Sequence, residues 1–104
     1  MSIAAPRVLA AAFDDIDSAR LWYEGQHAGL GSEFVRAVDA AVAAALAFPQ
    51  GHPIIHRQAR RVLLRRFPYC LFYRLDGEGI TIVACLHAAR DPKLVDARLG
   101  DEGE

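Results

Sequence analysis

The sequence has few of the residues that mark several common classes of protein. Its 104 residues include two cysteines, one methionine and one tryptophan, with no Cys-x-x-Cys pair and no Cys/His cluster of zinc-site spacing. No apolar run is long enough to span a bilayer, and the N-terminus is alanine-rich and broken by Pro6, unlike a secretion signal. We therefore expect a cytoplasmic protein with no metal, no cofactor and no membrane contact.

Lysine is also scarce, since eleven of the twelve basic residues are arginine. We favour a GC-rich genome as the reason for that preference, but the positions of the arginines are uneven. Residues 51–75 hold six arginines and no acid, whereas residues 1–50 hold three bases and six acids, and residues 76–104 hold three bases and seven acids. This segregation predicts a positive patch, and we favour a partner-binding role for it. Its centre is formed by Arg60, Arg61, Arg65 and Arg66.

The length predicts one domain, residues 1–104, which can bury enough surface to fold without disulfides. A hydrophobic fraction of 53% is high for so small a domain. Apolar surface beyond the usual scatter needs a partner to cover it, which is a first hint of a complex.

Hydrophobic spacing predicts two helices in the first half of the chain. One runs from about Ala11 to Gln26, and the second from about Leu30 or Ser32 to Phe48, where Pro49 begins a break. The apolar stripe of the first helix comprises Phe13, Ile16, Ala19, Leu21 or Trp22, and Tyr23; that of the second comprises Phe34, Val38, Ala41, Val42 and Ala45. The break holds His52 and His56, so a helical two-histidine metal site is not expected.

A β-hairpin is predicted around the turn at residues 76–79, which contains two glycines. With a loop of two or four residues, one face of the hairpin pairs Leu75 with Ile80, Tyr73 with Ile82, Leu71 with Ala84 and Tyr69 with Leu86. That face is the predicted core. The other face carries Pro68, Cys70, Phe72 and Arg74 opposite His87, Cys85, Val83 and Thr81, and it is the better place for function. Cys70 and Cys85 would then lie at disulfide distance, but two reduced, buried thiols are the favoured interpretation.

The remaining segments complete an α+β fold. We expect an edge strand within residues 3–9, a strand at 59–64, a bend at 65–68, a short helical turn from Pro92 and a frayed tail at 100–104. The two helices should form a hairpin packed on one face of a mainly antiparallel sheet of three to four strands, with the opposite face open.

The order of several short motifs resembles the RelE/ParE superfamily of type II toxin-antitoxin toxins, and within it the ParE-like plasmid stabilization branch. The motifs span nearly the whole chain. They are Asp15-Ile16, Trp22-Tyr23-Glu24, Gly29-Leu30-Gly31 with Phe34, Phe48-Pro49, Arg60-Arg61, Arg66-Phe67-Pro68-Tyr69, Phe72-Tyr73 and His87-Ala88-Ala89-Arg90-Asp91-Pro92. The resemblance implies a β-α-α-β-β-β order and a toxin neutralised by a cognate antitoxin.

The superfamily implies two activities, and a third interpretation stays open. ParE-like members resemble poisons of DNA gyrase without a hydrolytic centre, whereas RelE-like members cleave mRNA in the ribosome. A ribonuclease would need a general acid or base with cations near the phosphate, for which the candidates are His87, Arg65 and Arg74. Because the chain is net acidic and both hairpin tyrosines fall on the core face, the gyrase poison is favoured. A non-catalytic module that only binds a partner is the second alternative.

The candidate antitoxin- or target-binding residues combine the arginine segment with the second face of the hairpin. There an acidic amphipathic segment would meet both positive charge and apolar area. A structural role remains the favoured interpretation for His87, and a local ion pair for Arg90 with Asp91. The set is Arg60, Arg61, Arg65, Arg66, Phe72, Arg74, Val83, His87 and Arg90.

Overall fold

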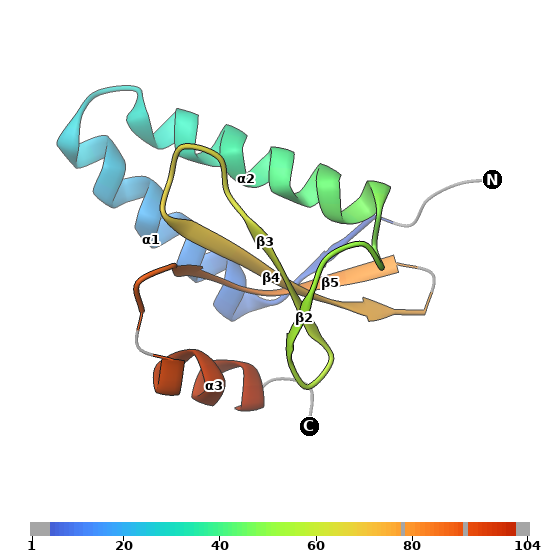
Figure 1. Ribbon diagram of the computed structural model, residues 1–104. Helices are drawn as coiled ribbons and strands as arrows, with labels where there is room; N and C mark the ends of the chain where they lie inside the picture. The colour runs from blue at the N-terminus through green and yellow to red at the C-terminus, as the bar shows by residue number, and fades with distance from the viewer. Residues whose placement is uncertain (1–4, 78, 91, 102–104) are drawn as a thin grey trace.

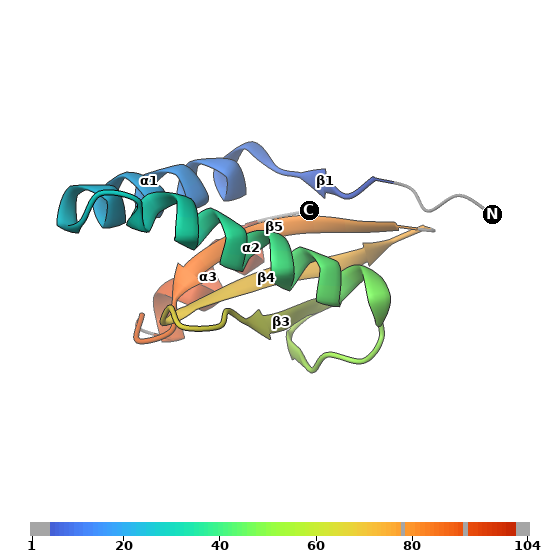
Figure 2. The ribbon, with the colours of Figure 1, turned by 90° about the horizontal axis from the view of Figure 1, so that it is seen from above.

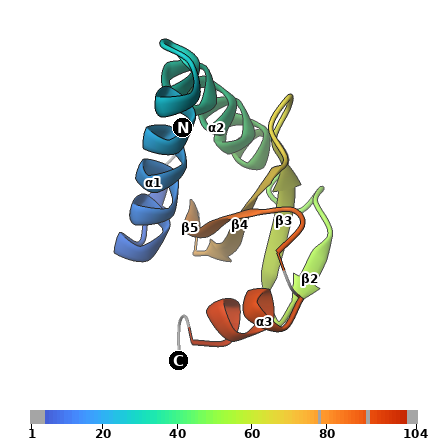
Figure 3. The same cartoon turned by 90° about the vertical axis from the view of Figure 1, so that its left-hand side faces the viewer.

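The computed structural model describes residues 5–77, 79–90 and 92–101. A two-helix hairpin lies on one face of a five-stranded sheet, and a third helix lies on the opposite face (Figures 1 and 3). The elements follow in the order β1 (Arg7–Val8), α1 (Ala10–Gln26), α2 (Leu30–Ala47), β2 (Ile54–His56), β3 (Ala59–Leu63), β4 (Tyr69–Asp76), β5 (Gly79–His87) and α3 (Pro92–Asp101). The predicted α+β class is confirmed.

Both predicted helices are present, but part of the predicted stripe of α1 points outward. α1 buries Ala12 and Ala19 and packs Ile16 and Tyr23 against the core, which is a helical spacing. The predicted packing of Phe13 and Leu21 is wrong, because their exposed fractions are 63% and 56%. Trp22, 58% exposed, touches only the edge of the Tyr23 ring in the ring contacts described. Of the predicted stripe of α2, Val42 is half-buried, and the buried positions are Phe34, Val38, Ala41 and Ala45.

The turn between the two helices is held by one carboxylate. Glu24 accepts hydrogen bonds from the backbone N–H of Gly29, at 3.1 and 3.0 Å, and from that of Gly31, at 3.0 Å. Gly29 has φ +90°, a conformation that favours glycine. At Gly31 an added Cβ would lie 2.8 Å from the Arg20 carbonyl oxygen, so the two helices approach closely there. These contacts explain why glycine stands at positions 29 and 31.

The sheet has the strand order β1-β5-β4-β3-β2, one strand more than the upper limit predicted. Figure 2 shows β1, β5, β4 and β3 in that order. β1 is an edge strand, as expected, and pairs parallel with β5. The additional strand is β2, for which no element was predicted; it follows the break that begins at Pro49 and pairs with Ala59 and Arg60 of β3. Three residues with an irregular register leave little periodic signal in the sequence.

A β-bulge changes the predicted register of the hairpin. Near the turn the predicted pairs Leu75–Ile80 and Tyr73–Ile82 are confirmed. Val83 is then an extra residue on β5, so beyond it the partners shift by one, and the predicted pairs Leu71–Ala84 and Tyr69–Leu86 are wrong. The observed partners are Phe72–Ala84, Leu71–Cys85, Cys70–Leu86 and Tyr69–His87.

The bulge also places the two cysteines on opposite faces of the sheet. Cys85 packs in the cluster beneath the helical hairpin, and Cys70 packs in the cluster beneath α3. The expected juxtaposition of Cys70 and Cys85 is therefore wrong. Both are free and buried, which confirms the interpretation as two structural thiols.

Helix α3 covers the face of the sheet that was expected to be open. Its Val95 and Leu99, one helical turn apart, pack against Phe72 and Val83, whose exposed fractions are 4% and 3%. The expectation of an open apolar face around Phe72 and Val83 is therefore wrong. The helix is longer than the short turn predicted and extends into residues 100 and 101 of the predicted frayed tail; residues 102–104 lie outside the described part of the chain.

Candidate functional site: a basic pocket between the sheet and helix α3

A pocket of about 230 Å³ opens where the end of β5 meets the start of α3. Its floor is apolar and its rim is basic, since Arg61 and Arg90 are exposed and Phe72 is buried beneath them. The lining residues are Ile55, Arg61, Cys70, Phe72, His87, Ala88, Arg90, Val95 and Asp96. Four of the predicted site residues therefore line this pocket: Arg61, Phe72, His87 and Arg90.

His87 is fixed by its neighbours. Its ring lies edge-on to Tyr69, with centroids 5.2 Å apart, and its Nδ1 accepts a hydrogen bond of 3.0 Å from the backbone N–H of Ala89. An accepting Nδ1 carries no proton, so the neutral ring holds its hydrogen on Nε2. In this arrangement His87 can donate a hydrogen bond but has no free lone pair with which to remove a proton.

Two further groups determine the chemistry of the pocket. Burial raises the pKa of the Cys70 thiol, and the nearby Arg61 guanidinium opposes that rise. On the α3 side, the Asp96 carboxylate lies 3.3 Å from Nδ1 of His56. Cys70 therefore forms part of the apolar wall. In the described part of the chain neither Arg61 nor Arg90 forms an ion pair, so both can meet an anionic or aromatic partner.

The other predicted site residues lie elsewhere. Arg60 lies on the face of the sheet that the helical hairpin covers. Its guanidinium donates to the carbonyls of His52, at 2.8 Å, and Gln50, at 3.2 Å. Arg66 pairs with Glu33 of α2 at 3.0 Å, and its φ of 71° bends the loop after β3. Arg65 is exposed beside α2, and Val83 is buried beneath α3.

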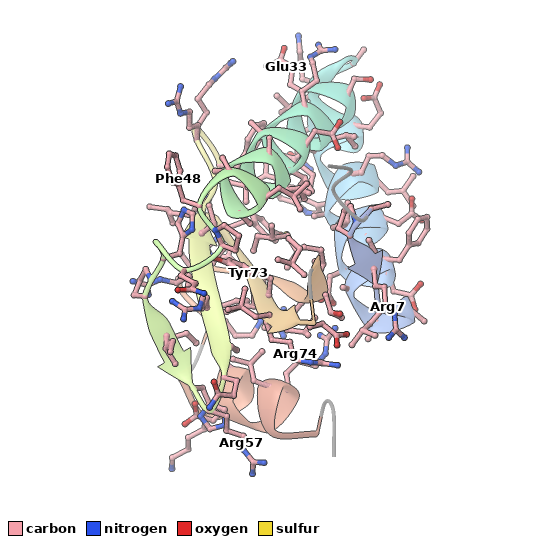
Figure 4. The ribbon with its side chains drawn as sticks, turned by 90° about the vertical axis from the view of Figure 1, so that its right-hand side faces the viewer. Arg7, Glu33, Phe48, Arg57, Tyr73 and Arg74 are labelled. Carbon is pink, nitrogen blue, oxygen red and sulfur yellow. The ribbon has the colours of Figure 1, made fainter. Side chains whose placement is uncertain are left out.

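The three residues considered for ribonuclease chemistry do not share a pocket. Arg74 pairs with Thr81 near the turn of the hairpin, while His87 pairs with Tyr69 at the opposite end. Figure 4 shows Arg74 on the side of the sheet that faces α3, far from Glu33. Arg65 lies near Glu33, since both line a pocket beside α2. His87, Arg65 and Arg74 are therefore placed separately.

The tyrosines serve the core. The Tyr73 hydroxyl donates to the Pro49 carbonyl at 2.6 Å and lies 3.1 Å from Nδ1 of His52. Burial raises the pKa of Tyr73, and burial with the Cys85 thiol raises that of Tyr69. Both rings lie on the face of the sheet covered by the helical hairpin, as the sequence predicted.

Sequence reasoning did not identify the link between Asp15 and Arg98. The Asp15 carboxylate accepts two hydrogen bonds from the Arg98 guanidinium, at 3.0 and 2.8 Å, and one of 3.0 Å from the backbone N–H of Cys85. This contact fixes α3, and hence one wall of the pocket. Asp15 is one of three neighbouring acids in α1, with Asp14 and Asp17, and nothing in the local sequence indicates which of them pairs with a base 83 positions away.

The comparisons with known proteins agree with the fold. A solved structure titled "Chromosomal ParDE TA system from P. aeruginosa" has a TM-score of 0.61 and 20% sequence identity, and the match covers 82% of this chain and 96% of that chain. A comparison with curated proteins gave no match. The sequence itself matches the family described as "ParE toxin of type II toxin-antitoxin system, parDE" over residues 7–92.

These findings define a RelE/ParE superfamily toxin with a helical hairpin, a five-stranded sheet and a basic pocket under α3. Within that superfamily, the chain belongs to the ParE toxin family of type II toxin-antitoxin systems. In the described residues, no group of three His, Cys, Asp or Glu side chains is arranged to hold a metal ion. No helix of the described chain is long and apolar enough to cross a membrane.

Proposed function

We propose that the 104 residues form one toxin domain that arrests growth by binding DNA gyrase, and that a cognate antitoxin neutralises it. The proposal also places the protein in the cytoplasm, as part of a plasmid stabilization module. Membership of the ParE family supports the toxin role. The choice of a binding mechanism over RNA cleavage rests on the pocket.

The observation that carries this choice is the hydrogen bond from Ala89 N–H to Nδ1 of His87. A general base needs a free lone pair directed at its substrate, and in this pocket the histidine lone pair is already used. The two exposed arginines over an apolar floor are suited to docking, because they supply charge around a pocket whose lining includes Val95.

The test is a supercoiling assay with purified gyrase and the purified toxin. We expect inhibition of supercoiling or accumulation of cleaved DNA, and a loss of roughly tenfold or more in potency for Arg61→Ala and Arg90→Ala. The matched control is Arg7→Ala, which removes an exposed arginine from the far edge of the sheet and should leave potency within about twofold. Unchanged gyrase activity at toxin concentrations that arrest growth would exclude this target.

Ribonuclease activity is the alternative, since the pocket does place a histidine beside Arg61 and Arg90. Induced expression, with DNA replication and translation scored separately, distinguishes the two. Gyrase poisoning stops replication first and leaves transcripts intact. Transcripts cut within ribosomes, with cutting abolished by His87→Ala in a folded variant, would replace the gyrase proposal. A protein that arrests neither process would be a partner-binding module only.

A further inference from the structure

The ring of His87 contributes a hydrogen-bond donor to the basic pocket under α3. Its Nδ1 accepts the backbone N–H of Ala89 at 3.0 Å, so in the neutral ring the proton lies on Nε2. In the described part of the chain no acceptor is bonded to this Nε2–H. The pocket is therefore lined by a histidine whose remaining ring nitrogen can donate a hydrogen bond but cannot accept one.

Two guanidinium groups line the same pocket as this donor. Arg61 comes from β3 and Arg90 from the segment that follows β5, and both are exposed. Among the described residues neither of them forms an ion pair. A guanidinium group has five donors and no acceptor, and it keeps its charge at every ordinary pH. Arg61, Arg90 and His87 thus supply only donors to the pocket, and two of the three are positively charged.

The carboxylate of Asp96, on α3, is the only one among the described residues that line the pocket, and it has a partner outside this lining. It lies 3.3 Å from Nδ1 of His56 on β2. The pocket therefore favours a negatively charged ligand, and its floor favours an apolar stem attached to that charge. The other lining residues are apolar: Ile55, Cys70, Phe72, Ala88 and Val95.

Arg90 also lines a second pocket, of about 360 Å³, which is less suited to an anion. That pocket lies against α1 and contains the carboxylates of Asp14 and Asp15. Asp15 is paired with Arg98 at 2.8 Å, whereas Asp14 forms no ion pair in the part of the chain that the structure describes. Because the Asp14 charge repels a second negative group, an anionic ligand of Arg90 is favoured on the α3 side.

We propose that the basic pocket under α3 binds an acidic side chain of gyrase, whose carboxylate accepts hydrogen bonds from Arg61, Arg90 and Nε2 of His87. This inference rests on the proposed binding of gyrase. It goes beyond that proposal by naming the chemical group that enters the pocket and by giving His87 the role of a donor.

A carboxylate fits this pocket better than a phosphate of gyrase-bound DNA. A carboxylate accepts paired hydrogen bonds from a guanidinium group, and such charge-assisted bonds are roughly twice as strong as neutral ones. Its methylene stem can lie against Ile55 and Val95, which are half-buried in the lining. A DNA phosphate is held between two sugars and brings no apolar stem, so it would leave these two side chains uncovered.

The first experiment compares two substitutions of His87 by the affinity of the purified toxin for purified gyrase without DNA. His87→Phe keeps a ring beside Tyr69 but has no donor, so it should weaken binding about tenfold or more. His87→Gln supplies an N–H donor again and should bind within about threefold of the original protein. Both variants lose the imidazole acceptor of the Ala89 N–H, so that loss does not distinguish them.

The second experiment identifies the bound group by carbodiimide coupling, which joins an amine to a carboxylate in contact with it. The original protein has one lysine, Lys93, which with the N-terminus gives the background. Arg61→Lys and Arg90→Lys each add an amine to the pocket, and each should form a new amide bond to an aspartate or glutamate of gyrase. Arg7→Lys, at an exposed position of the edge strand β1, is the matched control and should form no new bond to gyrase.

The outcomes separate this inference from the proposed function. Gyrase binding with the same affinity in both His87 variants would overturn this inference alone, as would the absence of a new bond from a lysine variant that still binds. If neither lysine variant binds, the His87 pair decides. Affinity losses that appear only in the presence of DNA would assign the pocket to a phosphate and overturn the inference too. Absence of any gyrase binding would remove the proposed function, and this inference with it.

Discussion

Asp15 and Arg98 join the first helix to the last through a two-point ion pair, with oxygen–nitrogen distances of 3.0 and 2.8 Å. The same carboxylate accepts the Cys85 N–H on the side of β5 beyond the end of β1. The Asp15 side chain therefore connects the helical layers on the two faces of the sheet and accepts a main-chain hydrogen bond from β5 between them.

Asp15→Ala should lower the free energy of unfolding by about 2–4 kcal/mol, because it leaves both the Arg98 guanidinium and the Cys85 N–H without their acceptor. Urea unfolding followed by circular dichroism measures the change. Asp17→Ala is the matched control: it removes an acid two residues further along α1 whose 2.7 Å pair with Arg20 is more exposed, so it should cost no more than about 1 kcal/mol. Equal losses in the two variants would contradict the role given to Asp15.

Gly31→Ala should destabilise the fold by about 1–3 kcal/mol, since the new Cβ would meet the Arg20 carbonyl oxygen at 2.8 Å. Gly25→Ala provides the comparison. Nothing lies within 4 Å of a Cβ at Gly25 in α1, so that change should stabilise the helix by about 0.5–1 kcal/mol. The midpoints of thermal unfolding should move in opposite directions, and a shift of the same sign in both would refute the packing argument.

Stability at alkaline pH should depend on Cys85. Burial, with smaller contributions from the Asp15 carboxylate and the Cys70 thiol, raises the pKa of Cys85 from 9.0 to about 12. The fold therefore favours the neutral thiol, and this stabilisation is complete below pH 9 and is lost as the pH rises towards 12.

The free energy of unfolding should accordingly fall less steeply above pH 9 in Cys85→Ala than in the original protein. The slopes of the two curves of unfolding free energy against pH should differ by up to about 1.4 kcal/mol per pH unit in that range. The contributions of Tyr23 and Tyr73, whose pKa values are also raised, are the same in both proteins and cancel. The pKa of Tyr69 is raised by burial and in part by Cys85, so its contribution is smaller in the variant and changes the slope in the same direction. Parallel curves above pH 9 would show that the thiol does not titrate with unfolding.

Leu99→Ala should loosen α3 and expose Cys70. Leu99 is 4% exposed, so its truncation should cost about 2–4 kcal/mol. Reaction of the native protein with a thiol reagent should then become faster at Cys70, while Cys85 on the opposite face stays protected. Leu75→Ala, at an exposed position near the hairpin turn, is the control and should leave both thiols slow to react. Faster reaction at Cys85 than at Cys70 would contradict the assignment of faces.

The sequence predicts the parts of this fold that repeat a local pattern. The limits of α2, the position of β3 and the hairpin pairs next to the turn all follow from hydrophobic spacing and turn residues. The bulge at Val83 is different, since nothing in an alternating apolar run indicates where one residue is extra. That single residue moves Cys85 to the other face and sets His87 opposite Tyr69.

The structure brings four of the candidate site residues together and separates the others, for a related reason. Arg61, Phe72, His87 and Arg90 do line one pocket, because the hairpin brings neighbouring strands together whatever the exact register. Arg60, Arg65 and Arg66 lie elsewhere, because alternation along β3 and the turn at Arg66 direct them to different surfaces. Arg74 is separated from the pocket because it lies near the turn of the hairpin. The interpretation of Arg90 with Asp91 as an ion pair falls partly outside the described residues.

The pair of Asp15 and Arg98 also has a consequence for the order of events during synthesis. Its members are 83 positions apart, so almost the entire chain must leave the ribosome before the contact can form. Until then α3 cannot be fixed over Phe72 and Val83, and an apolar patch of the nascent sheet stays uncovered. A binding partner that is present during synthesis therefore meets this patch before α3 covers it.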